Sequence, residues 1–507
     1  MSGKLTTLDL SIVVIYIVGT TLLGAWFTRR QRDMRTYFVG DRNVSWWLVL
    51  VSIVATETST VRFLSIPGVA YDPAAGNLTF LQLAFGYIVG RIVIAWLLLP
   101  QYLRGELFSA YQLLRERFSP AVQRTASGLF LITRTIVDGL RLCLTALLLQ
   151  QFAGWDIRVS ILALGFVTLV YTYLGGMEAV IWTDLVQFVI YVTGALIAGW
   201  FILDLLPGGF AEFVRINGEA GKFQVIDFDP SPVKVRTIWA GLIGGAFVTM
   251  ASHGADQNMV QRYLCARSLG AARTALVLSG FLVTVQFFVF LMIGLGLYAL
   301  VSSGVMSVGA GARNDEVFGI FIVNYLPAGL IGLVTAAVLA SAMASFSSSL
   351  NSAANAFVAD FYRPWRPHHS ERFYLALSKW MTTFWGLAKI SVALVCMPLL
   401  ANRSVVDQVL AVAAVTTGLI LGLFFLGSAR RPVRSEAAIA GLVIGFLVAG
   451  SLWCCWVLDR TVLAWPWFAP VGTGTTVAVA LLVNWLRTSR HAGQLTNRGP
   501  EPGLDAP

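Results

Sequence analysis

The sequence predicts an all-α polytopic membrane protein with about 13 transmembrane helices. Hydrophobic residues make up 57% of its 507 residues and charged residues only 12%. A soluble protein of this size needs roughly twice that charged fraction to cover its surface. The apolar residues also form blocks of about 20 or more, the length that a helix needs to cross a bilayer.

The apolar blocks follow one another along the whole chain, and no soluble domain separates them. The first block is too long for the apolar part of a signal peptide and has no small-residue cleavage site after it, so we expect a retained helix. The block at 316–357 is too long for one simple span and must tilt strongly or extend beyond the lipid. The expected spans are 8–27, 46–70, 80–103, 122–151, 157–175, 180–204, 236–257, 272–303, 316–357, 375–400, 405–427, 434–457 and 464–487.

Lysine and arginine residues indicate the orientation of these spans. One set of alternate loops contains roughly 22 of them and the other set roughly nine, which places the N-terminus outside and the C-terminus inside. The polar stretch 205–235 is then an extracellular loop, and residues 491–507 are a disordered cytoplasmic tail. The net charge of +10 therefore reflects topology, and we expect no nucleic acid partner.

The five cysteines and four histidines form no pattern typical of a metal site or a disulfide framework. No nucleophile–base pair stands out either, so we do not expect an enzyme.

Charged residues inside the apolar blocks are costly at membrane depth, and each is a candidate functional residue. Arg134, Asp138 and Arg141 can pair on one helix face, and this spacing fits a structural ion network as well as a ligand site. Arg91 lies near the cytoplasmic half of its helix and is expected to extend toward the interface. The sequence offers no explanation for Lys389. The candidates considered are Arg62, Arg91, Arg134, Arg141, Lys389, Glu57, Asp138, Asp184 and Asp256.

Residues 52–71 are unusual for a membrane helix. Six hydroxyl-bearing residues, Glu57, Arg62 and the Pro67-Gly68 pair crowd into one span. We expect a broken helix here, because the free carbonyls and half-helix ends of broken helices bind sodium and anionic ligands in secondary transporters. The alternative is a continuous helix with a proline kink and internally satisfied hydroxyls.

Two further segments are rich in small residues. In 335–360, Ser341, Ser345 and Ser348 are spaced four and three apart and share one stripe, where their hydroxyl oxygens fit a hard cation such as sodium. Close helix packing alone would also explain small residues. The pair Gly241 and Gly244 favours packing inside the protein over a dimer contact.

Four segments of the chain resemble the sodium:solute symporter family over almost the whole length. They are 37–42 with the tryptophans and broken-helix run that follow, 173–187, 254–264 and 345–360 with its Leu-Asn-Ser triplet at 350–352. The resemblance implies an inverted-repeat, LeuT-like core of ten helices in two five-helix repeats, 46–204 and 236–427. An extra helix and basic loop (1–45) would precede this core, and two helices (428–490) would follow it.

The resemblance also implies a sodium site between the first and eighth core helices. Ala344 departs from the hydroxyl residue that many members carry, and Ser341 can compensate for it. The implied ligands are Ala55, Thr58, Ser341, Ala344 and Ser345. The resemblance does not decide whether a second sodium ion binds at Asp184, Ser347 and Ser348.

For the solute, relatives that carry carboxylates use an arginine that corresponds to Arg134, and arginine pairs with carboxylates through two hydrogen bonds. The residues 409–415 have no polar side chain, which disfavours a sugar. The expected substrate-binding residues are Glu57, Arg62, Gln82, Arg134 and Asp256.

The expected function is sodium-coupled import of a small organic solute, first of all an organic anion or carboxylate, by alternating access across the inner (plasma) membrane. Three alternatives remain: a sugar or polyol symporter, a proton-coupled transporter and a membrane sensor module. The expected partners are the coupling ion Na+, the solute and the lipid bilayer, and the chain is expected to be a monomer or weak homo-oligomer.

Overall fold

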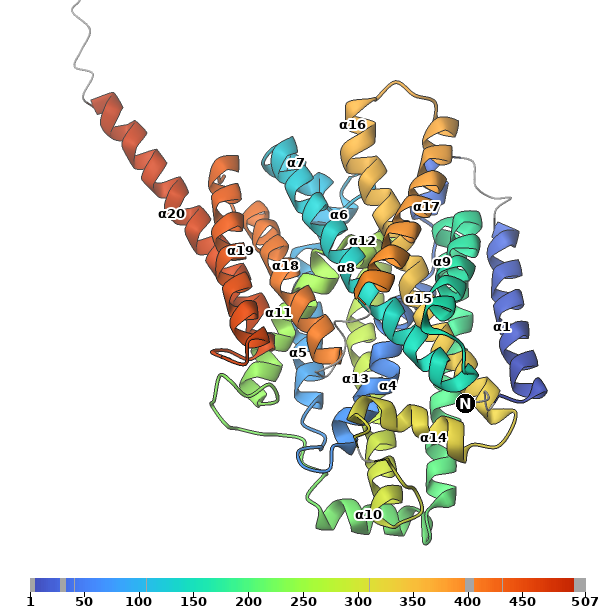
Figure 1. The fold of residues 1–507 in the computed structure, drawn as a ribbon. Helices are drawn as coiled ribbons and strands as arrows, with labels where there is room; N and C mark the ends of the chain where they lie inside the picture. Colours follow the sequence, from blue (N-terminus) through green and yellow to red (C-terminus); the bar gives the residue numbers. More distant parts are fainter. Residues whose placement is uncertain are drawn as a thin grey trace, which may run out of the picture.

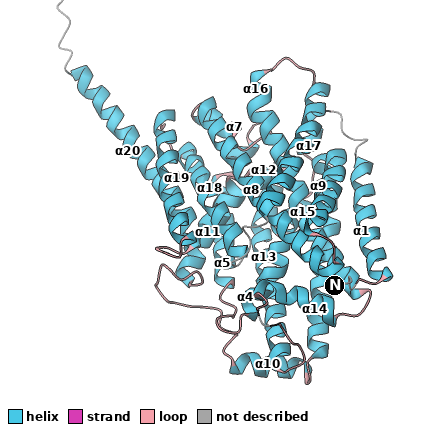
Figure 2. Ribbon diagram, in the orientation of Figure 1, coloured by secondary structure: helices cyan, strands magenta, loops and turns pink. Residues whose placement is uncertain are grey.

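The computed structural model describes residues 5–27, 33–40, 42–105, 107–309, 311–396, 405–430 and 432–496. These residues form helices without a β-strand (Figure 2), and a single bridge joins Val44 to Ala266. Seven helices are long and apolar enough to cross a membrane, or eight with one bent pair. The all-α membrane class is therefore confirmed, and the count of about 13 spans stays a prediction.

The helices stand side by side, with α1 on one flank and α19 and α20 on the other (Figure 1). The first half of the chain forms α1 (Thr7–Trp26), α2 (Met34–Val39), α3 (Trp46–Glu57), α4 (Thr60–Tyr71), α5 (Leu81–Leu97), α6 (Leu99–Leu103), α7 (Gln112–Arg117), α8 (Pro120–Ala153), α9 (Ile157–Leu205) and α10 (Gly209–Glu219). The second half forms the π-helix η2 (Ala240–Gly244), α11 (Gly245–Gly254), α12 (Gln257–Leu264), α13 (Leu269–Ser302), η3 (Asn314–Glu316), α14 (Val317–Tyr325), α15 (Leu330–Phe357), η4 (Val358–Tyr362), α16 (Arg363–Trp365), α17 (Glu371–Cys396), α18 (Val405–Ser428), α19 (Ser435–Val457), η6 (Trp465–Trp467) and α20 (Phe468–Thr496).

The predicted broken helix is present as α3 and α4, which meet at 66°. Thr58 and Ser59 separate them with extended backbone dihedrals, while Pro67 lies inside α4. The continuous helix with a proline kink is therefore wrong. The break falls in the run of hydroxyl residues, whose side chains compete with helical hydrogen bonds.

A second break, which the sequence did not predict, interrupts the expected span 236–257. The chain leaves the helix at Ala255, and Asp256 then caps α12 by accepting a hydrogen bond from the Asn258 backbone N–H at 2.8 Å. A short acidic side chain before a helix is a standard N-cap. The two breaks thus lie in the first helix of each expected repeat.

The expected single span at 316–357 is wrong. It consists of α14 and α15, separated at 326–329 by Pro327 and by Gly329, whose φ is 88°. Proline and a left-handed glycine are ordinary helix terminators. The more buried part is α15, which packs against α1, α8, α9 and α17.

The expected spans 157–175 and 180–204 are the two parts of α9, which a kink at Gly176 separates. Its φ of 62° favours glycine, and a Cβ atom there would lie 2.9 Å from the carbonyl oxygen of Tyr37. A side chain at this position would therefore strain both the turn and its contact with α2.

The glycines of η2 pack inside the protein, as expected. A Cβ atom on Gly241 would lie 2.6 Å from the backbone of Gln82, and one on Gly244 would lie 2.7 Å from Pro466. At the C-terminal end, α20 continues to Thr496, into the region predicted as a disordered tail. The rest of that tail, 497–507, lies outside the described residues.

Candidate functional site

A cavity of about 70 Å³ lies between α4, α8, α11 and α18, beside the break before α12. It has room for a few water molecules. Three arginines, one aspartate and several hydroxyl groups face an apolar wall from α18. The lining residues are Arg62, Tyr111, Phe130, Thr133, Arg134, Val137, Arg141, Val248, Ser252, Ala255, Asp256, Leu410, Ala413, Ala414, Thr416, Thr417 and Ile420.

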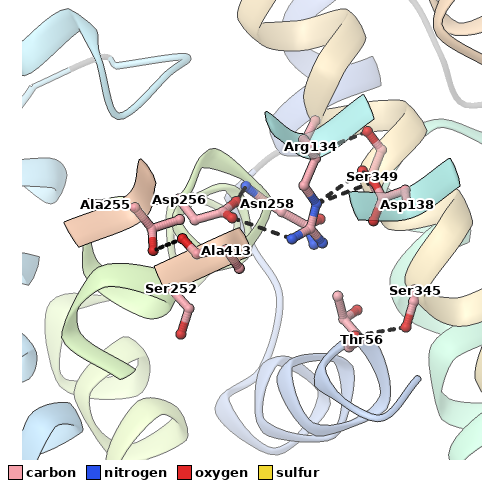
Figure 3. Close-up of polar contacts among 12 residues, drawn as sticks. Thr56, Arg134, Asp138, Ser252, Ala255, Asp256, Asn258, Ser345, Ser349 and Ala413 are labelled. Atoms are coloured by element: carbon pink, nitrogen blue, oxygen red, sulfur yellow. Dashed lines mark hydrogen bonds and ion pairs between the residues drawn. The ribbon is translucent and has the colours of Figure 1, made fainter. Parts of the chain in front are cut away.

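Arg134 is held in this cavity from two sides (Figure 3). Its Nη1 lies 3.4 Å from Asp256 Oδ2, and its Nε lies 3.3 Å from Asp138 Oδ2 and 3.2 Å from Ser349 Oγ. When the Asn258 side-chain amide is oriented so that both its oxygen and its nitrogen have hydrogen-bond partners, the Asn258 oxygen accepts from Arg134 Nη2 at 2.6 Å. The guanidinium is therefore oriented by α8, α15 and the broken helix together.

Asp138 lies at the centre of a buried ion network. Lys389 Nζ on α17 donates to Asp138 Oδ2 at 3.0 Å and to Ser349 Oγ at 2.5 Å, and Arg141 Nη1 lies 3.6 Å from Asp138 Oδ1. Lys389 is fully buried, so its role is to neutralise Asp138. The predicted pairing of Arg134, Asp138 and Arg141 is present, and both arginines also line the cavity.

Glu57 lies behind Arg62 and forms ion pairs with two arginines. Its carboxylate pairs with Arg62 Nη1 at 2.8 Å and with the Arg91 guanidinium, and His253 Nε2 lies 3.3 Å away. Arg91 is fully buried and also donates to Ser279 Oγ at 2.5 Å. The expectation that Arg91 extends toward the interface is therefore wrong.

Gln82 lies apart from the cavity. Its amide donates to the carbonyls of Thr79 and Arg236 and accepts from the Asp227 N–H, so it ties α5 to the loop 205–235. Of the five residues expected to bind substrate, the structure thus brings Arg62, Arg134 and Asp256 to one cavity. Glu57 supports Arg62, and Gln82 does not line the cavity.

Two residues of the expected sodium site, Ser341 and Ser345 on α15, contact the chain around the break between α3 and α4. The last α3 hydrogen bond runs from Thr58 N to Val54 O, so the carbonyls after Val54 lie beyond the helical ladder. Ser345 Oγ donates to Thr56 O at 3.0 Å, and the hydroxyls of Thr60 and Ser341 lie 3.4 Å apart.

These groups fit a sodium ion. The carbonyls of Ala55 and Thr58 and the hydroxyl oxygens of Ser341 and Ser345 are hard ligands with unused lone pairs. The hydroxyl of Thr58 bonds to Val54 O and Gln286 Oε1, which leaves its carbonyl as the ligand. Ala344 offers a carbonyl, which also accepts from Ser347 Oγ at 3.3 Å.

Two of the three residues of the possible second sodium site, Asp184 and Ser348, are joined by Arg262, which the sequence analysis missed. The third, Ser347, donates to Ala344 O on its own helix instead. Arg262 Nη2 lies 3.1 Å from Asp184 Oδ2 and contacts the hydroxyls of Thr56 and Ser348. Asp184 also accepts from Ser52 Oγ at 2.5 Å, whereas its buried Oδ1 has no hydrogen-bond partner within the described part of the chain. An ion at this site would therefore share Asp184 with the guanidinium. Arg262 lies in the 254–264 segment that carries the family resemblance, and this position was the signal in the sequence that could have identified it as a site residue.

The fold belongs to a known class of membrane transporter. The model of the sodium:solute symporter family matches residues 37–445, so the chain belongs to this family. The sodium/sialic acid symporter SiaT of Proteus mirabilis is 28% identical over 441 residues, which cover 87% of this chain and 88% of that protein. The human sodium/iodide cotransporter is 28% identical over 469 residues, 88% of this chain and 69% of that protein.

A solved structure of a Na+-coupled sialic acid symporter, substrate-bound and outward-open, matches with a TM-score of 0.85 and 26% identity. The match covers 95% of this chain and 98% of that one. The predicted transporter fold is confirmed, and the protein is a sodium-coupled symporter rather than an enzyme.

Proposed function

We propose that this protein imports a small organic anion with a carboxylate group, coupled to sodium, across the inner (plasma) membrane. The orientation of Arg134 in the cavity carries the proposal. Its guanidinium is largely buried, is held by neighbours on several helices and lines the space that a solute would enter. A guanidinium fixed in this way can bind a carboxylate through two parallel hydrogen bonds.

The charge balance around the cavity also favours an anion. Three cationic side chains line the cavity (Arg62, Arg134 and Arg141), and two more, Arg91 and Lys389, pair with Glu57 and Asp138, the carboxylates that also hold these lining arginines. Only three carboxylates, Glu57, Asp138 and Asp256, oppose them, which leaves a surplus of two positive charges. Such a surplus is costly in a low-dielectric site, and an anionic solute would relieve it. A neutral sugar would leave it uncompensated.

The rest of the cavity indicates which other groups the solute carries. Thr133 on α8, Ser252 on α11 and Thr416 and Thr417 on α18 are hydroxyl residues of its wall, beside the apolar residues of α18. A solute with a carboxylate at one end and a few hydroxyl or amide groups fits this distribution. Sialic acid and iodide, the substrates for which the two relatives are named, support an anion.

The helix α15 connects the proposed sodium and solute sites. Ser345 contacts the end of α3, and Ser349, one turn further along, contacts Arg134, Asp138 and Lys389. A cavity of about 20 Å³ between Ser345 and Asp138 has room for about one water molecule. Sodium that fixes α3 against α15 would thereby order the residues that hold Arg134.

This arrangement supports alternating access by the proposed repeats 46–204 and 236–427. Each repeat begins with a broken helix, and the solute cavity touches both broken helices through Arg62 and Asp256. Rocking of the repeats around this centre would expose the site to each side in turn. Because coupling is reciprocal, the solute should also tighten sodium binding. No part of this mechanism requires more than a monomer.

The proposal is tested by thermal unfolding of the purified protein with a panel of carboxylates and their neutral amides, in sodium or choline chloride at equal ionic strength. We expect some carboxylates to raise the unfolding temperature, more strongly in sodium, because a ligand that binds the folded state stabilises it. Their amides should have no effect. Stabilisation by neutral sugars or amides, but by no acid, would contradict the proposal.

The structure also predicts the effect of removing Lys389. The variant Lys389→Met removes the hydrogen bonds that buried Lys389 donates to Asp138 and Ser349, and we expect it to lose about 3 kcal/mol of stability because a buried carboxylate loses a charged donor. Lys379→Met on the same helix is the control, because Lys379 is only half-buried and has no ion pair with a described residue. Thermal unfolding of both variants checks this. Equal stability of the two variants would show that the pair with Asp138 contributes nothing.

A further inference from the structure

A groove of about 660 Å³, separate from the solute cavity, lies where α5, α6, α7, α13 and α18 approach the predicted cytoplasmic face. Five arginines line it, and no acidic side chain among the described residues does so. The lining residues are Arg42, Trp96, Leu97, Pro100, Gln101, Leu103, Arg104, Arg117, Ala266, Arg267, Ser268, Leu269, Arg273 and Ser428. Five like charges in one groove repel one another unless an anion lies among them.

Three of these arginines are fixed by the backbone, since Arg267 Nε also donates to Asn43 O at 2.9 Å. Arg42 donates from Nη1 to Gly105 O at 3.2 Å and from Nη2 to Leu107 O at 3.1 Å, and Arg273 Nε donates to Ala95 O at 2.9 Å. Arg42 adopts a left-handed backbone with φ of 53°, which is costly for a side chain other than glycine. The groove therefore holds positive charge in a preformed arrangement.

Unsatisfied polar groups also line the groove. Arg42 Nε and Gln101 Oε1 are buried and have no hydrogen-bond partner among the described residues. At the start of α13, Ser268 is the N-cap, so the first N–H groups of this 34-residue helix lack helical partners. Helix N-termini with free N–H groups bind phosphate. The charges and the donors thus favour the same kind of ligand, a phosphate group.

The surroundings favour a lipid as the source of this phosphate. Trp96 and Leu97, on the membrane-spanning α5, are 60% and 41% exposed beside the groove. The Arg273 guanidinium lies 5.5 Å from the centre of the Trp96 ring. Exposed tryptophan at the end of an apolar helix is typical of the membrane interface, where headgroups lie. The groove therefore opens toward both the headgroup region and the acyl chains.

We propose that this groove binds the headgroup phosphate of an anionic phospholipid from the cytoplasmic leaflet. The exposed Arg104, Arg117 and Arg267 would contact the phosphate oxygens, and Trp96 and Leu97 would pack against the chains. Basic pockets between helices on the cytoplasmic side recognise such lipids. Gln101 Nε2 donates to Ser428 Oγ at 2.8 Å, so a lipid here would brace α6 against the end of α18.

The test uses the full chain in nanodiscs of phosphatidylcholine with increasing phosphatidylglycerol, and thermal unfolding as the readout. The variant carries Arg104→Gln, Arg117→Gln and Arg267→Gln, three exposed positions. The control carries Arg124→Gln, Arg366→Gln and Arg372→Gln, which remove the same charge from exposed positions on the same predicted face. We expect the groove variant to need about 100-fold more phosphatidylglycerol than the wild type for the same rise in unfolding temperature. The reason is that each arginine contributes roughly fivefold to the affinity for the lipid. The control should respond as the wild type does.

Two results would overturn the proposal. An equal response of the groove variant and the wild type would show that the lipid binds elsewhere. Stabilisation by glycerol phosphate or inorganic phosphate in phosphatidylcholine discs, with no further effect of phosphatidylglycerol, would identify a soluble phosphate as the ligand instead. Neither result would bear on sodium or solute binding, because none of the three arginines lines the solute cavity.

Discussion

Arg134→Ala is expected to weaken solute binding about 100-fold, because a carboxylate would lose two charge-assisted hydrogen bonds. Arg134→Lys should recover only part of this loss, since lysine keeps the charge but not the paired geometry. Sodium binding without solute should change little, because Arg134 is not among the proposed sodium ligands. The solute concentration for half-maximal uptake measures the effect.

Arg124→Ala is the matched control for this prediction. Arg124 lies on the same helix, α8, but is exposed and does not line the cavity. We expect its uptake to match that of the wild type. An unchanged half-maximal concentration in Arg134→Ala would show that the solute binds elsewhere, and would leave the charge surplus around the cavity without a function.

Ser345→Ala is expected to raise the sodium concentration for half-maximal uptake about tenfold or more. The variant loses a hydroxyl ligand and its bond to the Thr56 carbonyl, and interactions with charged groups are worth about 1.5–3 kcal/mol each. Apparent solute affinity should fall at low sodium and recover at saturating sodium, because the two sites are coupled. A sodium titration of uptake at two solute concentrations measures both effects.

Ser391→Ala is the control for the sodium prediction. The Ser391 hydroxyl is exposed on α17 and donates only to Leu387 O on the same helix, at 2.9 Å. If Ser345→Ala needs the same sodium concentration as the wild type, Ser345 is excluded as a sodium ligand. A loss that high sodium does not restore would indicate a structural role instead.

The sequence predicted the features that depend on local composition. The apolar blocks defined the membrane helices, and the hydroxyl residues around Thr58 predicted the first break. The second break, at Ala255 and Asp256, follows no comparable cluster and has only an N-cap signal. The end of α14 is marked by Pro327 and Gly329, and this signal was overlooked within a long apolar block.

The pairings between distant helices could not be predicted from local patterns. Lys389 meets Asp138 across 251 residues, and Arg262 meets Asp184 across 78. Helical periodicity shows which residues share a face, but not which faces meet. For the same reason the sequence identified Arg134 and Asp256 as candidates without showing that they lie 3.4 Å apart. Their assignment as substrate-binding residues remains a proposal.

The central claim is that sodium entry drives the uptake of a carboxylate. The most direct test is uptake of a stabilising carboxylate into proteoliposomes with an inward sodium gradient, compared with choline chloride at equal ionic strength and with an inward proton gradient alone. The account predicts accumulation above the external concentration only with the sodium gradient, and none in Arg134→Ala. Equal accumulation without sodium, driven by the proton gradient, would contradict it.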